Sequence, residues 1–549
     1  MATVRDAAAE DSSLDYDYIV IGSGFGGSVS ALRLAEKGYR VAVLEMGRRW
    51  TPESLPRTSW QLHRWFWRPR LGLRGFFNMR FFRHVTVLHG CAVGGGSITY
   101  GSTLLRPPEK VWQMGSWCGL AAWEEEMPGH YAEAERMLGV VENRILGAAD
   151  LMLQDAAESV GAGETFYRTR VGILQAPGGD TSPRDVGDPF FGGRGPARTT
   201  CNGCGGCMMG CRNGAKNTLD QNYLYLAEQL GAQVFAETKV VDVRPLDGLE
   251  GRTGYAVETV RSTSLLPARR RRFTAGAVVF AASSLGTTEL LFRLRDKGSL
   301  PKIGAQLGRH IRTNSESLIG VRIPGCVQDM SKGVAIGSGV YIDAHTHIEA
   351  VRYPSGSDSM GLLSTILTGG RPGHSRIGLW LRTLAGQLLW HPWKTARLFW
   401  PTRWARECVI LLCMQAVESQ LEMRYRRAWW WPFGKTMGSY GERVPTFIPA
   451  ANRFAQQFAA RAGGAAMSML PEILFDVPGT AHCLGGCVMG RSAEEGVVDG
   501  QQRVFGYRNL YICDGSVVSA NLGVNPSLTI TALAERAMAA IPAKERLTP

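Results

Sequence analysis

The sequence predicts an α/β fold, in which a Rossmann-like domain on a parallel sheet carries an inserted α+β lobe with an antiparallel sheet. A strand, a glycine-rich turn and a helix follow one another at 19–38, and a second strand ends at Glu45. The same order of strand, small-residue turn and helix returns at 273–292, which suits a strand of the same sheet. With 549 residues the chain is too long for one ordinary core. A nucleotide-binding domain built from both chain ends is therefore expected to enclose a lobe at 310–470.

The turn after the first strand has the spacing of a dinucleotide-binding fingerprint. The run IVIGSGFGGS at 19–28 contains Gly22-x-Gly24-x-x-Gly27, and an acid follows at Glu45. Gly22 permits the tight turn, Gly24 lets the backbone approach a pyrophosphate, and Gly27 lets helix and strand pack closely. The helix N-terminus offers unpaired N–H groups to phosphate, and Glu45 can accept hydrogen bonds from a ribose. The pattern indicates nucleotide binding.

Composition limits the class of protein and its partners. The chain is 45% hydrophobic and 20% charged, with a net charge of +13, as in a globular protein with a basic surface. No uninterrupted apolar stretch has the length that spans a bilayer, and no nucleic-acid-binding motif accompanies the charge. The first residues carry acids where a secretory signal has an apolar core. We therefore expect a disordered lead over 1–14, a cytoplasmic location and no nucleic-acid partner.

Basic and aromatic residues gather in three stretches. These stretches lie at 60–84, 379–404 and 424–433, and in each of them Trp or Phe alternates with Arg or Lys. Such mixtures are typical of contact with an anionic membrane surface, which would place the protein peripherally on the inner face of the membrane. Packing of the same aromatic side chains between lobes is the alternative for each stretch.

Four segments together resemble the glucose–methanol–choline (GMC) family of flavin oxidoreductases, most closely its cholesterol-oxidase-like branch. They are IGSGFGGSVSALRLAEKGYRVAVLE at the start, AVGGGSITYGS at 92–102, AHCLGGCVMG at 481–490, and NLYICDGSVVSANLGVNPSLTITALAERA at 509–537. The resemblance implies FAD as the cofactor and a substrate domain inserted into an FAD-binding domain. The cofactor-binding residues that it implies, together with the fingerprint, are Gly22, Gly24, Phe25, Gly26, Gly27, Glu45, Gly94, Gly95, Gly96, Ser97, Val240, Asp514, Gly515, Asn525 and Pro526.

The same resemblance divides the chain into domains. After the lead, FAD-binding parts are expected at 15–125, 201–310 and 478–549, a loop-rich segment of the substrate lobe at 126–200, and the substrate-binding domain at 311–477. Whether FAD is attached covalently stays open, because His84 and His89 lie near the glycine loop.

Three residues are expected to carry catalysis. The resemblance implies His482 of HCLGG and Asn525 of GVNP, and imidazole titrates near neutral pH, as a group handling a hydroxyl proton must. Asn525 can donate to the substrate oxygen without carrying a charge. Glu349 is the third candidate: the resemblance implies a glutamate that removes a ring proton, and a carboxylate between apolar neighbours has a raised pKa and can serve as a base near pH 7. A salt bridge with Arg352 is the alternative role for Glu349.

Four cysteines form a separate cluster, Cys201-x2-Cys204-x2-Cys207-x3-Cys211. This spacing is that of a bacterial ferredoxin loop and favours an iron–sulfur cluster, with zinc, free thiols or local disulfides as alternatives. An occupied cluster would favour transfer of electrons to an external acceptor, such as a quinone or redox protein, over direct reaction with O₂.

The sequence thus predicts an FAD-dependent enzyme that oxidises a secondary hydroxyl on a lipophilic alcohol. A sterol 3-hydroxyl is the first expectation, with double-bond isomerisation as a further step and O₂ or an external acceptor as oxidant. The alternatives are a dehydrogenase of a non-steroid alcohol, such as a terpenoid, and a membrane-docking flavin and iron–sulfur electron carrier.

Overall fold

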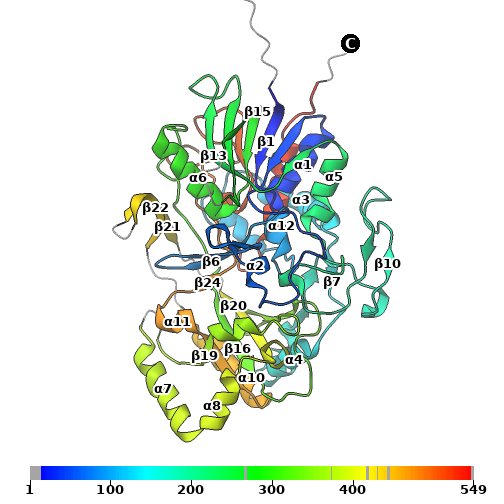
Figure 1. The fold of residues 1–549 in the computed structure, drawn as a ribbon, viewed down its shortest axis with the longest axis vertical. Helices are drawn as coiled ribbons and strands as arrows, with labels where there is room; N and C mark the ends of the chain where they lie inside the picture. Colours follow the sequence, from blue (N-terminus) through cyan, green and yellow to red (C-terminus); the bar gives the residue numbers. More distant parts are fainter. Residues whose placement is uncertain are drawn as a thin grey trace, which may run out of the picture.

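The computed structural model describes residues 14–264, 269–371, 374–415, 420–428, 431–441 and 446–545. The expected lead over 1–14 therefore lies almost wholly outside the described residues. Two sheets occupy opposite ends of an elongated molecule, and both described chain ends lie beside the first sheet (Figure 1).

The first sheet is the predicted Rossmann-like sheet. β1 pairs in parallel with β2 and with β15, so the strand predicted at 273–292 does return to the nucleotide-binding sheet. β25, from the C-terminal part of the chain, pairs in parallel with β15 and joins the two chain ends in one sheet. β13 and β14 extend this sheet with antiparallel pairing. In spatial order the strands are β12 (Gln233–Phe235), β2 (Val41–Leu44), β1 (Tyr16–Ile21), β15 (Arg271–Phe280), β14 (Tyr255–Arg261) and β13 (Thr238–Pro245), with β25 (Leu510–Ile512) beside β15.

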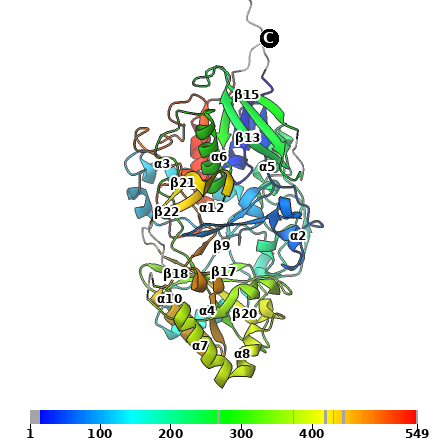
Figure 2. The ribbon, with the colours of Figure 1, turned by 60° about the vertical axis from the view of Figure 1, so that its left-hand side comes forward.

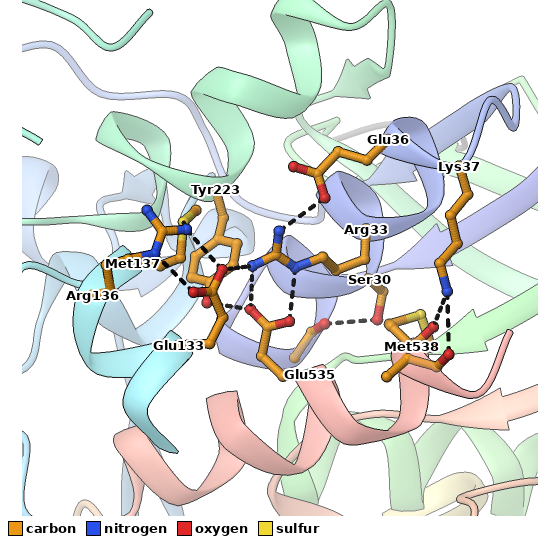
Figure 3. Close-up of polar contacts among 12 residues, drawn as sticks. Ser30, Arg33, Glu36, Lys37, Glu133, Arg136, Met137, Tyr223, Glu535 and Met538 are labelled. Carbon is orange, nitrogen blue, oxygen red and sulfur yellow. Dashed lines mark hydrogen bonds and ion pairs between the residues drawn. The ribbon is translucent and has the colours of Figure 1, made fainter. Parts of the chain in front are cut away.

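Helices from distant parts of the chain pack with this sheet in one large core. α1 contacts both α5 and the C-terminal helix α12, and α12 also contacts α3. These helices are α1 (Phe25–Glu36), α3 (Trp123–Met137), α5 (Tyr223–Gln229), α6 (Ser283–Lys297) and α12 (Ser527–Ala539). Figure 3 shows a polar cluster where four of them meet: Arg33 of α1 donates to Glu535 of α12 and to Glu133 of α3, while Tyr223 of α5 also donates to Glu535.

The second sheet is antiparallel throughout and belongs to the inserted lobe. Its edge strand β8 comes from the loop-rich segment before the cysteine cluster, so the lobe draws on two parts of the chain. Helices α4 (Ala148–Ser159) and α10 (Pro449–Arg461) bury their apolar residues with those of the sheet in a second core. In spatial order the strands are β19 (Ser364–Ile366), β23 (Ala465–Met469), β16 (Ser317–Arg322), β20 (Cys408–Gln415), β18 (Thr346–Val351), β17 (Ile336–Tyr341) and β8 (Tyr167–Arg168).

Shorter elements lie between the two large sheets and around them. A three-stranded sheet of β5, β6 and β24 lies between the two large sheets, and the β21–β22 hairpin projects beside it (Figures 1 and 2). The remaining helices are α2 (Leu62–Trp65), α7 (Ile377–Trp390), α8 (Pro392–Phe399), α9 (Trp404–Glu407) and α11 (Leu470–Leu474). The remaining strands are β3 (Trp67–Arg68), β4 (Leu73–Arg74), β5 (Phe77–Phe81), β6 (Thr86–Gly90), β7 (Val141–Glu142), β9 (Arg170–Val171), β10 (Asp185–Val186), β11 (Arg198–Thr199), β21 (Leu421–Ala428), β22 (Trp431–Gly441) and β24 (Gly479–Thr480).

The three basic aromatic stretches have different surroundings. In the first, Trp65, Trp67, Phe76 and Phe77 are buried, and three of them belong to a third apolar core, so internal packing explains most of that stretch. The second forms α7 and α8, whose aromatic side chains are largely exposed. The third falls on β21 and β22, with residues 429–430 outside the described part. Among the described residues, no helix has the length and apolarity needed to cross a bilayer.

Candidate active site

A cavity of about 1540 Å³ lies between the two sheets and brings most of the predicted site residues together. The glycine turn after β1 lines one end of it, and His482 with Asn525 lines the middle. The far end is apolar and comes from the antiparallel sheet. Its lining there includes Leu318, Ile336, Val351, Ile410 and Leu412. A long ligand with one polar and one apolar part fits such a space.

The glycine turn leaves an open cradle at one position and is closely packed at the others. A Cβ on Gly24 would meet nothing within 4 Å, whereas one on Gly26 would lie 1.6 Å from the carbonyl oxygen of Cys513. Gly22 has a φ of +103° and packs on Ala281, and Gly95, at φ +53°, packs on the backbone of Gly24. α1 begins directly after Gly24 without a side-chain cap or an acid in its first turn. Its N-terminal N–H groups thus remain available to an anion.

Glu45 lies at the same end of the cavity and is buried. Its carboxylate accepts hydrogen bonds from the backbone N–H and hydroxyl of Ser23, at 3.0 and 2.7 Å, and from Gly47 N–H at 2.6 Å. Burial raises the pKa of Glu45, and these hydrogen bonds oppose that rise. Each carboxylate oxygen has two lone pairs, so the residue can still accept from a ribose hydroxyl.

Several predicted cofactor residues lie just behind the cavity wall. The hydroxyl of Ser97 donates to Gly94 O at 2.6 Å and accepts from Leu219 N–H, which shapes the loop of Gly95 and Gly96. Gly27 packs against Gly22, since a Cβ there would lie 2.1 Å from the Gly22 carbonyl oxygen. These residues form the loop backbone, while Gly95 and Gly96 themselves reach the cavity.

The C-terminal part of the chain and β13 also contribute to the wall. Asp514, Gly515 and Pro526 of the C-terminal part line the cavity, as does Val240 of β13. The Asp514 carboxylate accepts from Ser516 N–H at 2.8 Å and from the Thr287 hydroxyl at 2.5 Å, and burial raises its pKa. The turn that bears Gly515 is therefore held in place before any ligand binds. The uncapped helix, the vacant cradle at Gly24 and the buried acid at the ribose end together fit the pyrophosphate and ribose of FAD.

His482 and Asn525 meet at the centre of the cavity. Asn525 Nδ2 lies 3.5 Å from His482 Nε2, at the long limit of a hydrogen bond. On its other side His482 pairs through Nδ1 with Glu316, a residue at the start of β16. Glu316 also accepts from Ala481 N–H at 3.2 Å, so it holds both the ring and the backbone beside it. With Nδ1 donating to this carboxylate, Nε2 is the nitrogen that can accept a proton from the cavity side.

The electrostatic surroundings of His482 favour its charged form. Burial by itself lowers the pKa of His482, but the charge and hydrogen bond of Glu316, with the charge of Glu349, outweigh burial and raise it. Reasoning from the sequence missed Glu316. No local motif marks it, since it lies 166 residues before its imidazole partner.

Glu349 lies behind Asn525 and is completely buried. Its Oε2 accepts from Asn525 Nδ2 at 3.3 Å, and its Oε1 has no hydrogen-bond partner among the described side chains and backbone. Burial raises the pKa of Glu349 to about 7. The alternative of a salt bridge with Arg352 does not form, because Arg352 pairs with Asp150 at 2.6 Å instead. Asn525 thus separates the carboxyl of Glu349 from the cavity.

A second polar pair that the sequence did not reveal lies beside Glu349. The Tyr167 hydroxyl of β8 lies 2.6 Å from His347 Nε2, within hydrogen-bond distance, and His347 stands two residues before Glu349 on β18. Gly339, on the strand between them, makes room for this: a Cβ there would lie 2.6 Å from the Tyr167 hydroxyl. Burial lowers the pKa of His347 to about 4, so the ring is neutral near pH 7.

The cysteine cluster does not provide the predicted metal site. Within the described residues, no group of three or more His, Cys, Asp or Glu side chains is placed to hold a metal ion, so the iron–sulfur and zinc interpretations of Cys201, Cys204, Cys207 and Cys211 are not supported. All four are free thiols. Cys201 belongs to a small apolar core, and Cys207 and Cys211 pack against it. Burial raises the pKa of Cys201 and Cys204, and that of Cys204 reaches about 11.

The two histidines near the glycine loop differ in position. His84 does not line the cavity, and its Nδ1 lies 2.9 Å from the hydroxyl of Ser439, which does. His89 lines the cavity, and its Nε2 has no partner among the described residues. Burial, reinforced by Arg80, lowers the pKa of His89 to about 4.

Comparison with known proteins identifies the family. Profiles described as GMC oxidoreductase match residues 197–312 and 440–534, and one for an NAD(P)-binding Rossmann-like domain matches residues 20–89. A cholesterol oxidase of Acinetobacter baumannii is 56% identical over 98% of this chain and 96% of its own length. A cholesterol oxidase of Mycobacterium tuberculosis is 45% identical over 96% of this chain and 92% of its own. The chain belongs to the GMC oxidoreductase family.

Other similar proteins are more distant. A long-chain-alcohol oxidase of Arabidopsis thaliana is 24% identical over 94% of this chain and 66% of its own length. The crystal structure of pyridoxine 4-oxidase from Mesorbium loti superimposes with a TM-score of 0.60 at 15% identity, covering 95% of this chain and 98% of that chain. It shows that the two proteins share a fold. As a GMC oxidoreductase, the chain uses FAD.

Proposed function

We propose that this protein is an FAD-dependent alcohol oxidase that converts a sterol 3-hydroxyl to the ketone and passes the electrons to O₂. The observation that carries the proposal is the placement of His482, Asn525 and Glu316 on the same cavity as the glycine cradle. The apolar far end of that cavity suits a steroid ring system. The cholesterol oxidases of Acinetobacter baumannii and Mycobacterium tuberculosis, similar over nearly their full lengths, support the choice of substrate.

His482 and Asn525 each have a defined role in the oxidation. Bound FAD supplies the acceptor for the hydride that leaves the carbinol carbon. His482 Nε2 accepts the hydroxyl proton, while Glu316 holds the other ring nitrogen and stabilises the imidazolium that results. Asn525 donates from Nδ2 to the substrate oxygen, which keeps that oxygen within reach of Nε2 and the carbinol hydrogen directed at the flavin. Two electrons and one proton leave the carbinol carbon as hydride, and the second proton is on His482.

Glu349 is proposed as the base of a subsequent isomerisation. After oxidation, a proton on the ring carbon between the new carbonyl and the double bond is acidified. The Glu349 carboxylate takes that proton and returns it to the distal carbon of the double bond, which moves into conjugation. A pKa of about 7 suits a group that must both accept and release a proton near neutral pH. Because Asn525 lies between Glu349 and the cavity, this role requires the carboxyl to turn past the amide.

The choice of O₂ as acceptor follows from the cysteine cluster and the relatives. The hypothesis of an external quinone or redox-protein acceptor rested on an iron–sulfur cluster, and no metal site is found among the described residues. The similar proteins are named oxidases. We therefore propose hydrogen peroxide as the second product.

Anaerobic mixing of the yellow holoprotein with alcohols tests the oxidation. Detergent-dispersed cholesterol is expected to bleach the flavin band, and admission of air is expected to restore it with about one peroxide per turnover. Bleaching by long-chain primary or terpenoid alcohols but not by sterols would reassign the substrate. Bleaching by sterols without peroxide in air would reassign the acceptor.

The isomerisation is tested separately with Glu349→Gln. This variant is expected to oxidise cholesterol but to release the unconjugated ketone, because the amide cannot take up the ring proton. Chromatography of the products, with Glu349→Asp as the variant that keeps the carboxyl, checks this. Conjugated product at an unchanged rate from Glu349→Gln would assign the base elsewhere.

A further inference from the structure

Helices α7 and α8 form a hairpin at the end of the molecule farthest from the Rossmann-like sheet (Figures 1 and 2). α7 is 14 residues long and buries none of them in the described structure. Only Thr395 and Leu398 are buried on α8. The two helices contact each other, and little of the remaining described fold covers them.

The uncovered surface of this hairpin is apolar to an unusual degree. Leu389, Trp390 and Trp393, at the turn between the helices, are 72%, 76% and 82% exposed. Further exposed apolar side chains of the hairpin and the residue after it are Ile377, Leu379, Leu381, Leu388, Phe399 and Trp400. Single exposed leucines are ordinary on a protein surface, but this many large apolar side chains exposed on one hairpin mark a contact site.

The hairpin itself carries basic residues and no acids. From residue 359 to residue 406 the chain contains no Asp or Glu. Arg382, Lys394 and Arg397 are exposed on the two helices. Beyond α8, Arg403 pairs with Glu407 and Arg406 pairs with Asp329. A second copy of this chain, docked through the same hairpin, would bring Arg382, Lys394 and Arg397 of the two copies together, and the hairpin carries no acid to balance them. An anionic phospholipid surface matches both the basic groups and the apolar residues, and Trp is enriched at such interfaces.

The hairpin is attached where the apolar end of the cavity lies. Trp380 Nε1 of α7 donates to the Thr365 hydroxyl on β19 at 2.8 Å. Arg376, just before α7, donates to the Glu472 carbonyl oxygen on α11 at 3.2 Å. Ser364 of β19 and Pro471 with Glu472 of α11 line the cavity. A surface that rests against the hairpin is thus next to the substrate end of the site.

We propose that the α7–α8 hairpin lies in the headgroup region of an anionic phospholipid bilayer and docks the enzyme there without spanning the membrane. Its apolar face enters the boundary between headgroups and acyl chains, and the basic residues contact lipid phosphates. In the case of a sterol substrate, which rests on the function proposed above, the docked enzyme takes the substrate directly from the bilayer into the apolar end of its cavity. Docking itself does not depend on the identity of the substrate.

Flotation with vesicles tests docking without any turnover. The holoenzyme is expected to float with vesicles of equal parts phosphatidylcholine and phosphatidylglycerol, more weakly with phosphatidylcholine alone, and less as salt is raised. The variant with Leu389→Asp, Trp390→Asp and Trp393→Asp is expected to lose at least about tenfold in bound fraction. Leu249→Asp is the matched control, because Leu249 lies on the Rossmann-like domain and its side chain is 68% exposed. This variant is expected to bind the vesicles as the wild type does.

Activity then separates docking from catalysis. The triple variant is expected to oxidise cholesterol in these vesicles at least about tenfold more slowly, yet to oxidise a detergent-dispersed steroid within about twofold of the wild-type rate. Loss of both activities would point to misfolding, which circular dichroism and the flavin spectrum would reveal, and Arg382→Glu with Lys394→Glu then tests the charge alone. Equal flotation of the wild type and all variants would overturn the proposal. A wild-type protein that binds no vesicles but forms a dimer, which the triple substitution converts to a monomer, would also overturn it.

Discussion

Glu316 is the residue on which the electrostatics of the proposed site depend most. Its carboxylate bonds both the His482 ring and the backbone of Ala481, so it fixes the direction in which Nε2 points. It also raises the pKa of the imidazole against the effect of burial. Since His482 must be neutral to accept the hydroxyl proton, the rate is expected to rise with pH through that raised pKa.

Glu316→Gln is expected to move the acid limb of the pH profile of kcat/KM to lower pH. Without the negative charge, burial of His482 is no longer outweighed, so its pKa falls and the base form persists to lower pH. The plateau rate is expected to fall by roughly 10²-fold, because the amide no longer stabilises the imidazolium. Steady-state kinetics between pH 5 and pH 9 (about the range in which His titrates) measures both effects.

Glu316→Asp is the control, since it keeps the charge and should keep most of the raised pKa. An acid limb at the wild-type position in Glu316→Gln would show that the titrating group is not His482 coupled to Glu316.

At the scale of elements, two glycines in the turn between β1 and α1 have different roles. Gly26 lacks a side chain because the chain of Cys513 passes directly over it, which joins the first helix to the last part of the sheet. Gly24 has a φ of −72°, which any residue can adopt, and open space beside its Cβ position. The fold therefore requires glycine at position 26, whereas a bound ligand requires it at position 24.

Substitution by alanine distinguishes these uses. Gly24→Ala is expected to leave the unfolding temperature of the apoprotein nearly unchanged while weakening FAD binding at least about tenfold, because the added methyl occupies the path of the pyrophosphate. Gly26→Ala is expected to destabilise the apoprotein by about 3 kcal/mol, the upper end of ordinary overpacking. Thermal unfolding of apoprotein and titration with FAD give the two readouts. Unchanged FAD affinity in Gly24→Ala would place the cofactor away from this turn.

At the scale of the whole molecule, the two ends of the chain are joined by more than strand pairing. Arg33 of α1 donates to both oxygens of Glu535 of α12, at 2.7 and 2.8 Å, and the same guanidinium reaches Glu133 of α3 (Figure 3). Lys37, one turn on, donates to the Met538 carbonyl oxygen at 2.5 Å. These contacts satisfy buried charge at the place where the N-terminal and C-terminal parts of the FAD-binding domain meet.

Arg33→Met is expected to destabilise the protein by about 3–5 kcal/mol, because it leaves the carboxylate of Glu535 buried without its cation. Arg136→Met is the matched control: Arg136 pairs with Glu133 but is 55% exposed, and an exposed pair contributes less than about 1 kcal/mol. Denaturant unfolding of both variants measures the difference. Similar losses in the two variants would mean that the buried charge of Glu535 is accommodated in another way.

Whether a prediction from the sequence agrees with the structure depends on whether the feature is decided by neighbours in the chain or by residues far apart in it. The β1–α1–β2 unit and the strand at 273–292 were predicted because their patterns are local, and the structure confirms their shared sheet. The iron–sulfur prediction also rested on a local pattern, but it is not supported among the described residues, because the spacing of four cysteines does not determine whether the fold arranges them to hold a metal. The aromatic stretches also needed the fold, since Trp65 is 1% exposed and Trp393 is 82% exposed in similar sequence surroundings.

The sequence by itself determined the fold class, the FAD fingerprint and the membership of the family, because each depends on short patterns of glycine, apolar residues and acids. The pairing of His482 with Glu316, the position of Glu349 behind Asn525, and the exposure of the α7–α8 hairpin were decided by the tertiary structure alone. Each of these joins or separates residues far apart in the chain, and a side chain's charge state and solvent exposure depend on whatever the fold places beside it.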